Sequence, residues 1–77
     1  MRVKVYAPPF AKREKIDENN YLELQEGATL KEVFNLLEIP LPIGAVFLCR
    51  VNYEKADLGM TLQEGDVISF YFPLAGG

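Results

Sequence analysis

The residues with the clearest chemical potential close the printed sequence, which ends Pro73-Leu74-Ala75-Gly76-Gly77. Proline lacks a backbone donor and ends strand pairing, and the side chains after it shrink toward glycine, which has no Cβ atom. Such a slim arm can enter a narrow active site of another protein. There the α-carboxylate of Gly77 could be adenylated and then captured by sulfur or by an amine. We therefore predict a flexible tail over residues 73–77 with its reactive group at Gly77.

The rest of the sequence offers few groups for catalysis. It contains no histidine, so neither a Ser-His nor a Cys-His dyad can form. Its one cysteine, Cys49, excludes an intramolecular disulfide, and the lack of histidine argues against a zinc site. Cys49 lies in an apolar run, which indicates an inert core thiol. Phosphate-loop and dinucleotide signatures are absent. We therefore expect a chain that is no enzyme on its own and binds no metal or cofactor.

Length and charge narrow the class of protein further. The 77 residues suffice for one small domain, and 49% hydrophobic with 25% charged residues is an ordinary globular composition. The net charge of −3 argues against nucleic-acid binding, which normally needs a basic surface. The sequence has neither an apolar stretch of about 18 residues nor a signal-peptide core. We therefore expect no membrane segment and a cytoplasmic location.

Two alternating segments predict a β-hairpin near the start of the chain. Residues 2–6 and residues 21–25 each alternate polar and apolar side chains, as half-buried strands do. The polar residues 11–20 between them are typical of an exposed connection. Glu26-Gly27 then supplies the turn signal that ends the hairpin.

Residues 29–40 predict a single helix. Thr29 and Glu32 have the spacing of a capping box, in which the Thr29 hydroxyl accepts a hydrogen bond from the Glu32 amide. Apolar side chains recur at helical spacing and predict a stripe that packs on a sheet: Leu30, Val33, Phe34 and Leu37. Pro40 ends the predicted helix, Leu30–Glu38, because the residue before a proline avoids the helical region.

The second half of the chain predicts further strands and turns. Residues 45–51 are almost all apolar, as in a strand that is covered on both faces or that faces a partner. A turn is predicted over residues 52–55, whereas a short strand and a helical turn both remain open for residues 56–62. A tight turn over residues 63–66, with glycine at positive φ, precedes the last strand, residues 67–72.

This order of elements predicts an α+β fold. One helix among hairpins must bury its stripe on one face of the sheet. If the first and last strands lie side by side at the centre, the fold is a β-grasp, the ubiquitin-like arrangement. We predict this fold for residues 1–72, as a mixed sheet of four to five strands with one main helix on one face.

Several of these segments occur in the order and spacing of one known family. They are Glu26-Gly27-Ala28-Thr29-Leu30, Val51-Asn52, Leu62-Gln63-Glu64-Gly65-Asp66-Val67 and Phe72-Pro73-Leu74-Ala75-Gly76-Gly77. With them the chain resembles the ubiquitin-like sulfur carriers of the MoaD/ThiS family. This family includes the small subunit of molybdopterin synthase and the thiazole-forming carrier of thiamine synthesis, and the chain resembles the former more. The resemblance extends over the whole chain and is strongest over residues 22–37 and 48–77.

The resemblance implies a mechanism and a set of partners. An adenylating enzyme of the ubiquitin-activating type, using ATP and magnesium, would adenylate Gly77, and a sulfurtransferase would supply the sulfur of a thiocarboxylate. The tail would then enter the large subunit of molybdopterin synthase and give its sulfur to a cyclic pterin precursor. Gly76 and Gly77 match the family's channel and reaction positions. The resemblance also implies partner contacts for Tyr71, Phe72, Pro73, Leu74 and Ala75, although ordinary strand packing remains an alternative for Phe72.

Departures from the molybdopterin pattern keep other functions open. Phe72 stands where that subunit commonly has the first of two prolines, and the helix is as short as in thiamine-type carriers. The Phe-Ala-x-x-Arg-Glu pattern of its opening hairpin is shortened here to Phe10-Ala11-Lys12-Arg13-Glu14. Sulfur delivery to thiazole is one alternative. A protein modifier joined to lysines through Gly77 is a second, and an interaction module with an incidental Gly-Gly ending is a third.

Overall fold

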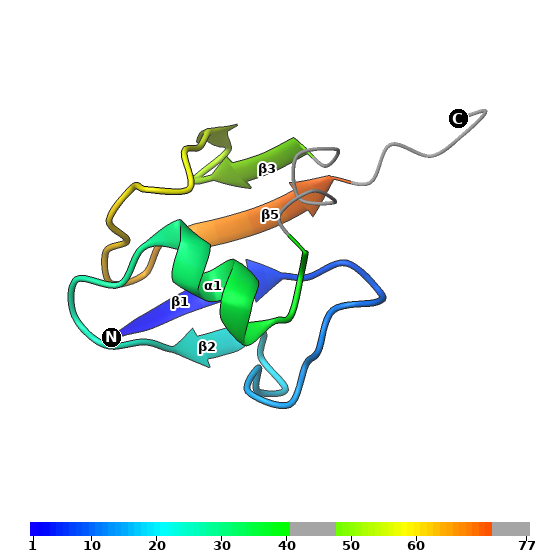
Figure 1. Ribbon diagram of the computed structural model, residues 1–77. Helices are drawn as coiled ribbons and strands as arrows, with labels where there is room; N and C mark the ends of the chain where they lie inside the picture. The colour runs from blue at the N-terminus through cyan, green and yellow to red at the C-terminus, as the bar shows by residue number, and fades with distance from the viewer. Residues whose placement is uncertain (41–47, 72–77) are drawn as a thin grey trace.

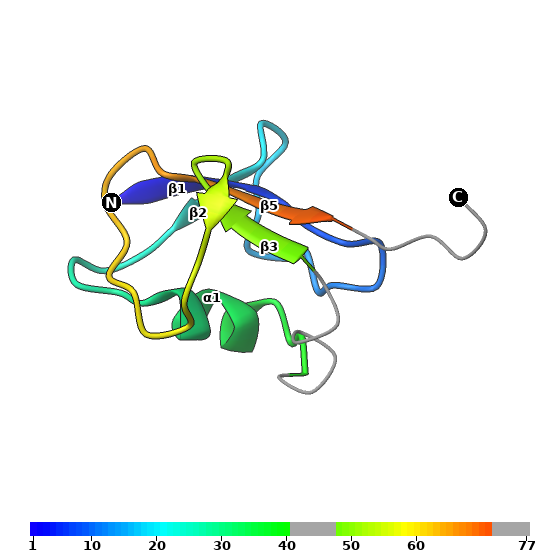
Figure 2. The ribbon, with the colours of Figure 1, turned by 90° about the horizontal axis from the view of Figure 1, so that it is seen from above.

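The described elements form one sheet and one helix. The computed structural model describes residues 1–40 and 48–71, so the predictions for residues 41–47 and 72–77 lie outside the described part. The elements are β1 (Arg2–Tyr6), β2 (Tyr21–Glu23), α1 (Leu30–Leu36), β3 (Leu48–Val51), β4 (Glu54–Lys55) and β5 (Val67–Tyr71). The sheet has the strand order β2-β1-β5-β3-β4, and α1 lies on one of its faces (Figures 1 and 2). The predicted β-grasp fold is confirmed.

The first and last strands lie side by side at the centre of the sheet, as predicted. β1 pairs with β5 in parallel, with Val5 opposite Ile68, whereas the other strand pairs are antiparallel. Val3, Val5 and Ile68 are fully buried. Parallel neighbours need a long crossover connection, and the segment that carries α1 provides it. The central strands are therefore buried because this connection returns across one face of the sheet.

The apolar stripe of α1 packs on the sheet as the sequence predicts. Leu30, Val33, Phe34 and Leu37 are each at most 2% exposed. The Phe34 ring lies against Phe70 of β5, with ring centroids 5.3 Å apart and planes at 55°. A helix of seven residues is not stable alone in water, so this burial is what holds it. Each fully buried large side chain contributes about 1.5–3 kcal/mol.

The start of α1 differs from the prediction. The capping box is wrong, because Thr29 makes no side-chain cap hydrogen bond. The Leu30 amide instead donates to the Met60 carbonyl at 3.1 Å, and the Lys31 amide donates to the Leu58 carbonyl at 2.9 Å. Residues 56–62, whose structure the sequence left open, form a turn and one bridge rather than a strand or helix. Backbone carbonyls of this loop therefore accept hydrogen bonds from the first amides of α1, in place of the Thr29 side chain.

The end of α1 is set by a backbone motif before Pro40. The helix ends at Leu36, two residues earlier than predicted, and Glu38 adopts a left-handed φ of 54°. The Glu38 amide donates to the Asn35 carbonyl at 3.1 Å, and the Ile39 amide donates to the Phe34 carbonyl at 2.9 Å. These two bonds form a Schellman motif, which satisfies the last carbonyls of a helix.

The Asn52 side chain joins the β3–β4 turn to the start of β5. Its Nδ2 atom donates to Asp66 Oδ1 at 2.9 Å, and its Oδ1 atom accepts from the Val67 amide at 3.0 Å. The other Asp66 oxygen accepts from the Gln63 amide at 2.8 Å. Gly65 has a φ of 83°, as predicted for this turn. The Asn52 and Gly65-Asp66 segments, which are distant in the sequence, thus form one hydrogen-bonded unit.

Tyr53 occupies a position in this turn that suits glycine. Its φ is 69° and it is 71% exposed. Asn52 and Tyr53 both have positive φ, as the two central residues of a type I′ hairpin turn do. A Cβ atom is strained in this conformation, whereas glycine adopts it readily. Tyr53→Gly is expected to raise the free energy of unfolding by about 0.5–1 kcal/mol, measured by urea denaturation. The comparison variant Asn52→Ala, which loses two hydrogen bonds, should lower it by roughly 1–3 kcal/mol. A less stable Tyr53→Gly protein would contradict this account.

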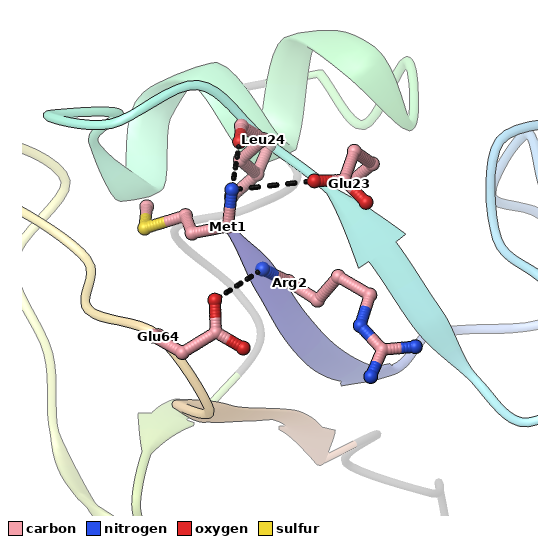
Figure 3. A network of polar contacts seen from close by, with 5 residues as sticks. All are labelled: Met1, Arg2, Glu23, Leu24 and Glu64. Atoms are coloured by element: carbon pink, nitrogen blue, oxygen red, sulfur yellow. Dashed lines mark hydrogen bonds and ion pairs between the residues drawn. The ribbon is translucent and has the colours of Figure 1, made fainter.

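Polar contacts hold the start of β1 between its neighbours (Figure 3). The Met1 ammonium donates to the Leu24 carbonyl at 2.8 Å and to Glu23 Oε2 at 3.2 Å. On the other side, the Arg2 amide donates to Glu64 Oε1 at 2.9 Å. The turn before β5 therefore helps to align β1 with β5. Figure 3 also shows that the Arg2 guanidinium extends away from the Glu64 carboxylate.

Candidate functional site

The described part of the chain contains one of the predicted site residues, Tyr71. The other predicted site residues lie outside it, and their roles remain predictions: Phe72, Pro73, Leu74, Ala75, Gly76 and Gly77. The structure does define the strand from which they continue. The candidate site is therefore the end of β5 together with the surface around it.

Strands flank β5 on both sides and fix its position. Ile68 lies opposite Val5 of β1 and Val51 of β3, and Tyr71 lies opposite Leu48 of β3. Phe70, one residue before Tyr71, packs on the Phe34 ring of α1. β5 is therefore a central strand, and its last residues are supported by β3 and, through Phe70, by α1.

The sheet face opposite α1 extends along β5 from its start, beside Arg2 and Lys4, to its end, beside Tyr6 and Tyr71. We call it the outer face, and it includes Arg2, Lys4, Tyr6, Tyr21, Arg50 and Tyr71. Alternate residues of the same strands, such as Val5 and Ile68, belong to the core under α1, so these side chains project the other way. Tyr6 is 45% exposed and Tyr71 is 47% exposed. Because β1 and β5 are parallel, both tyrosines lie toward the same end of the sheet.

Cations and tyrosine rings alternate on the outer face. The Arg2 guanidinium lies 4.6 Å from the centroid of the Tyr21 ring. Lys4 Nζ lies 5.5 Å from the Tyr21 centroid and 5.9 Å from the Tyr6 centroid. These distances are within the range of cation–π attraction. The rings therefore hold both cations on the surface without neutralising their charge.

This array was missed by sequence reasoning. The alternation of Arg2, Lys4 and Tyr6 predicted that they share a face, but it assigned them no role. Their association with Tyr21 depends on the β1–β2 register, in which Lys4 lies opposite Tyr21. Residues 7–20 separate β1 from β2. The alternation within each strand shows which side chains share a face, but it does not show which residue of β1 lies opposite which residue of β2.

Cys49 has the character of a core thiol, as predicted. It lies opposite Phe70 in the β3–β5 register, and it packs against the hydrophobic core. Burial raises the pKa of the Cys49 thiol to about 11, and the charge of Arg50 lowers it less. The reactive thiolate is therefore scarce at neutral pH.

The raised pKa predicts slow alkylation of Cys49. At pH 8 we expect the folded protein to react with iodoacetamide on the order of 100-fold more slowly than free cysteine, whose pKa is about 8.5. The rate should keep rising with pH up to about 11, where the thiolate becomes the major form. The protein unfolded in urea is the control and should react like free cysteine. Equal rates for the folded and unfolded protein at pH 8 would contradict the assignment.

The described residues show neither a metal cluster nor a membrane span. Within residues 1–40 and 48–71, no three His, Cys, Asp or Glu side chains are grouped so that they could hold a metal ion. In the same part of the chain, no helix has the length and hydrophobicity needed to cross a membrane.

Comparisons with known proteins agree with this geometry. The model of the ThiS family matches residues 3–77. The comparison with curated proteins found no match. Among solved structures, the chain is similar to the crystal structure of SAMP1 from Haloferax volcanii, with a TM-score of 0.62 and 19% sequence identity. That alignment covers 100% of this chain and 98% of the other, so the two proteins share the β-grasp fold throughout.

Proposed function

Because this chain belongs to the ThiS family of ubiquitin-like sulfur carriers, we propose that it carries sulfur as a thiocarboxylate on Gly77. The observation that carries the proposal is the family match over residues 3–77, which includes the Gly-Gly ending. The position of β5 supports it, since a strand held on both sides presents whatever follows it at a fixed point. The chain supplies the reacting carboxylate, and a partner enzyme supplies the catalysis.

The proposed chemistry has three steps. In the first step, a Gly77 carboxylate oxygen attacks the α-phosphate of ATP in the activating enzyme, and pyrophosphate leaves. In the second step, the terminal sulfur of a persulfide on a sulfurtransferase attacks the acyl-adenylate carbonyl, and AMP departs to give an acyl disulfide. In the third step, a second thiol attacks the inner sulfur, forms a disulfide with the sulfurtransferase and releases the carrier. The product is a thiocarboxylate. Leu74, Ala75 and Gly76 would occupy the narrow approach to the active site of the partner, where the small Ala75 and Gly76 let the arm extend.

We propose molybdopterin synthesis as the destination of the sulfur. In this role the chain is the small subunit of molybdopterin synthase, and its tail enters the large subunit, which acts on a cyclic pterin precursor. The sequence resemblance at residues 62–67 and 73–77 supports this choice. Tyr71 and Phe72 would contact the partner at the root of the tail.

Thiazole synthesis is the second candidate, and three observations favour it. Phe72 stands where the molybdopterin carriers commonly have a proline, and α1 has only seven residues. The family description that matches the chain is also that of the thiazole carriers. Both candidates share the thiocarboxylate and differ in the enzyme that accepts it.

Intact mass spectrometry tests the carrier function and then separates the two destinations. The purified chain is incubated with ATP, magnesium, a sulfur donor and the adenylating enzyme encoded in the same genome. We expect a mass gain equal to the exchange of one oxygen for one sulfur. No gain would refute the carrier function. The thiocarboxylated chain is then divided between a molybdopterin synthase large subunit with its cyclic pterin precursor and a thiazole synthase with its substrates. Loss of the added mass only with the second set would refute the molybdopterin assignment.

A further inference from the structure

The outer face has a charge opposite to that of the whole chain. The chain carries 11 acidic and 8 basic residues, a net charge of −3. The outer face nevertheless presents Arg2, Lys4 and Arg50. Glu23 lies opposite Arg2 in the β1–β2 register, and its carboxylate lies 3.2 Å from the Met1 ammonium. The positive charge is therefore concentrated on one side of an acidic protein.

These cations have no carboxylate partners within the described chain. The ion pairs found in residues 1–40 and 48–71 are Met1–Glu23 and Lys12–Glu38, and neither involves the outer-face cations. The Arg50 guanidinium makes one hydrogen bond, to the Cys49 carbonyl at 3.4 Å. Arg50 also lies directly opposite Lys55 in the β3–β4 pair. Like charges at such positions repel each other and destabilise a sheet, so this arrangement does not serve the fold.

Apolar surface accompanies the charge. Tyr6 and Tyr71 each expose nearly half of their surface toward the end of the sheet from which the tail leaves. The cations Lys4 of β1 and Arg50 of β3 lie on opposite sides of β5, so two strand spacings of about 5 Å separate their strands. Cations separated by this distance can pair with several carboxylates of a partner's extended surface, whereas one small anion could not contact them all. Exposed tyrosine and arginine are also the residues enriched at protein interfaces.

We propose that the outer face binds an acidic surface of the activating enzyme. Carboxylates of the enzyme pair with Lys4, Arg50 and Arg2, and Tyr6 and Tyr71 are covered at the tail end of the same interface. This inference rests on the proposed carrier function, because it takes the enzyme that adenylates Gly77 as the partner. Complementary charge steers the two proteins together and orients the tail toward the nucleotide site. A protein partner fits better than nucleic acid, which a chain of net charge −3 would repel.

The test compares charge reversal on the two sides of the molecule. The outer-face variant is Lys4→Glu with Arg50→Glu, and the matched control is Lys15→Glu with Lys31→Glu. Lys31 is exposed on α1, and Lys15 lines a groove with α1 residues, so the control changes net charge equally on the helix side. ATP–pyrophosphate exchange by the activating enzyme is measured at rising carrier concentration. Circular dichroism melting checks that both variants are folded.

We expect the outer-face variant to raise the KM for the carrier roughly tenfold or more, with kcat nearly unchanged, and the control to change KM less than about twofold. The wild-type KM should also rise with added KCl, a measurement that needs no variant.

Equal KM values for both variants, with normal exchange by the wild type, would overturn this inference alone. Absence of exchange with the wild type would overturn the carrier function and this inference with it. Tighter binding of single-stranded DNA than of the enzyme, lost in the outer-face variant, would overturn the assignment in favour of nucleic acid.

Discussion

Deletion of Gly77 is expected to abolish thiocarboxylate formation completely. The acyl-adenylate forms on the terminal carboxylate, and its position relative to ATP must be correct to within a fraction of an ångström. Shortening the arm by one residue withdraws that carboxylate by about 3.3–3.6 Å. It also replaces the reacting glycine by Gly76. Intact mass spectrometry after incubation with the activating enzyme, ATP and a sulfur donor should show no gain.

The same deletion should leave the fold unchanged. The core of the described chain is formed by residues 3–68, so the melting temperature should equal that of the wild type. Gly59→Ala is a matched control, because a Cβ atom there would meet nothing within 4 Å. This control should be thiocarboxylated at the wild-type rate. A mass gain that persists without Gly77 would place the reactive group elsewhere and contradict the proposed carrier chemistry.

Phe34→Ala is expected to cost about 3–5 kcal/mol of the free energy of unfolding. Phe34 is 2% exposed and packs on Phe70, so its removal leaves a cavity between α1 and β5. A domain of this size is stable by only about 5–15 kcal/mol in total, and the variant would lose much of that. Urea denaturation followed by circular dichroism measures the change.

Two further substitutions show whether the cavity is the cause. Phe34→Leu retains most of the apolar volume and should cost less than Phe34→Ala. Asn35→Ala changes the exposed neighbour on the same helix and should stay within about 0.5 kcal/mol of the wild type. A loss below about 1 kcal/mol for Phe34→Ala would mean that α1 is not held by this contact. It would also remove the support assigned to the end of β5.

Several features of the molecule were fixed by local sequence patterns. The apolar stripe of α1 follows from helical spacing, and the burial of Val3, Val5 and Leu22 follows from strand alternation. The turn at Gly65 follows from the conformational freedom of glycine. These patterns depend on residues close together in the sequence, so they can be read without knowledge of the fold. The Gly-Gly ending and its proposed chemistry also come from the sequence alone.

Other local features could not be predicted because distant parts of the chain replace the expected interaction. Thr29 and Glu32 have capping-box spacing, yet the carbonyls of Leu58 and Met60 accept from the first amides of α1. Glu38 and Tyr53 adopt positive φ, which their residue types disfavour. In both positions the hydrogen bonds and burial around the turn outweigh the local preference.

The sequence by itself determined the helix, the β-grasp order and the candidate reactive residue Gly77. It did not predict β4, because residues 52–55 were predicted as a turn, whereas Glu54–Lys55 form a strand that pairs with β3. Only the tertiary structure decided which side chains share the outer face with β5. The outer face combines Arg2 and Tyr6 of β1, Tyr21 of β2, Arg50 of β3 and Tyr71 of β5. Their neighbourhood depends on the register between strands separated by long connections. A shift of one residue in any pair would have moved these side chains to the buried face.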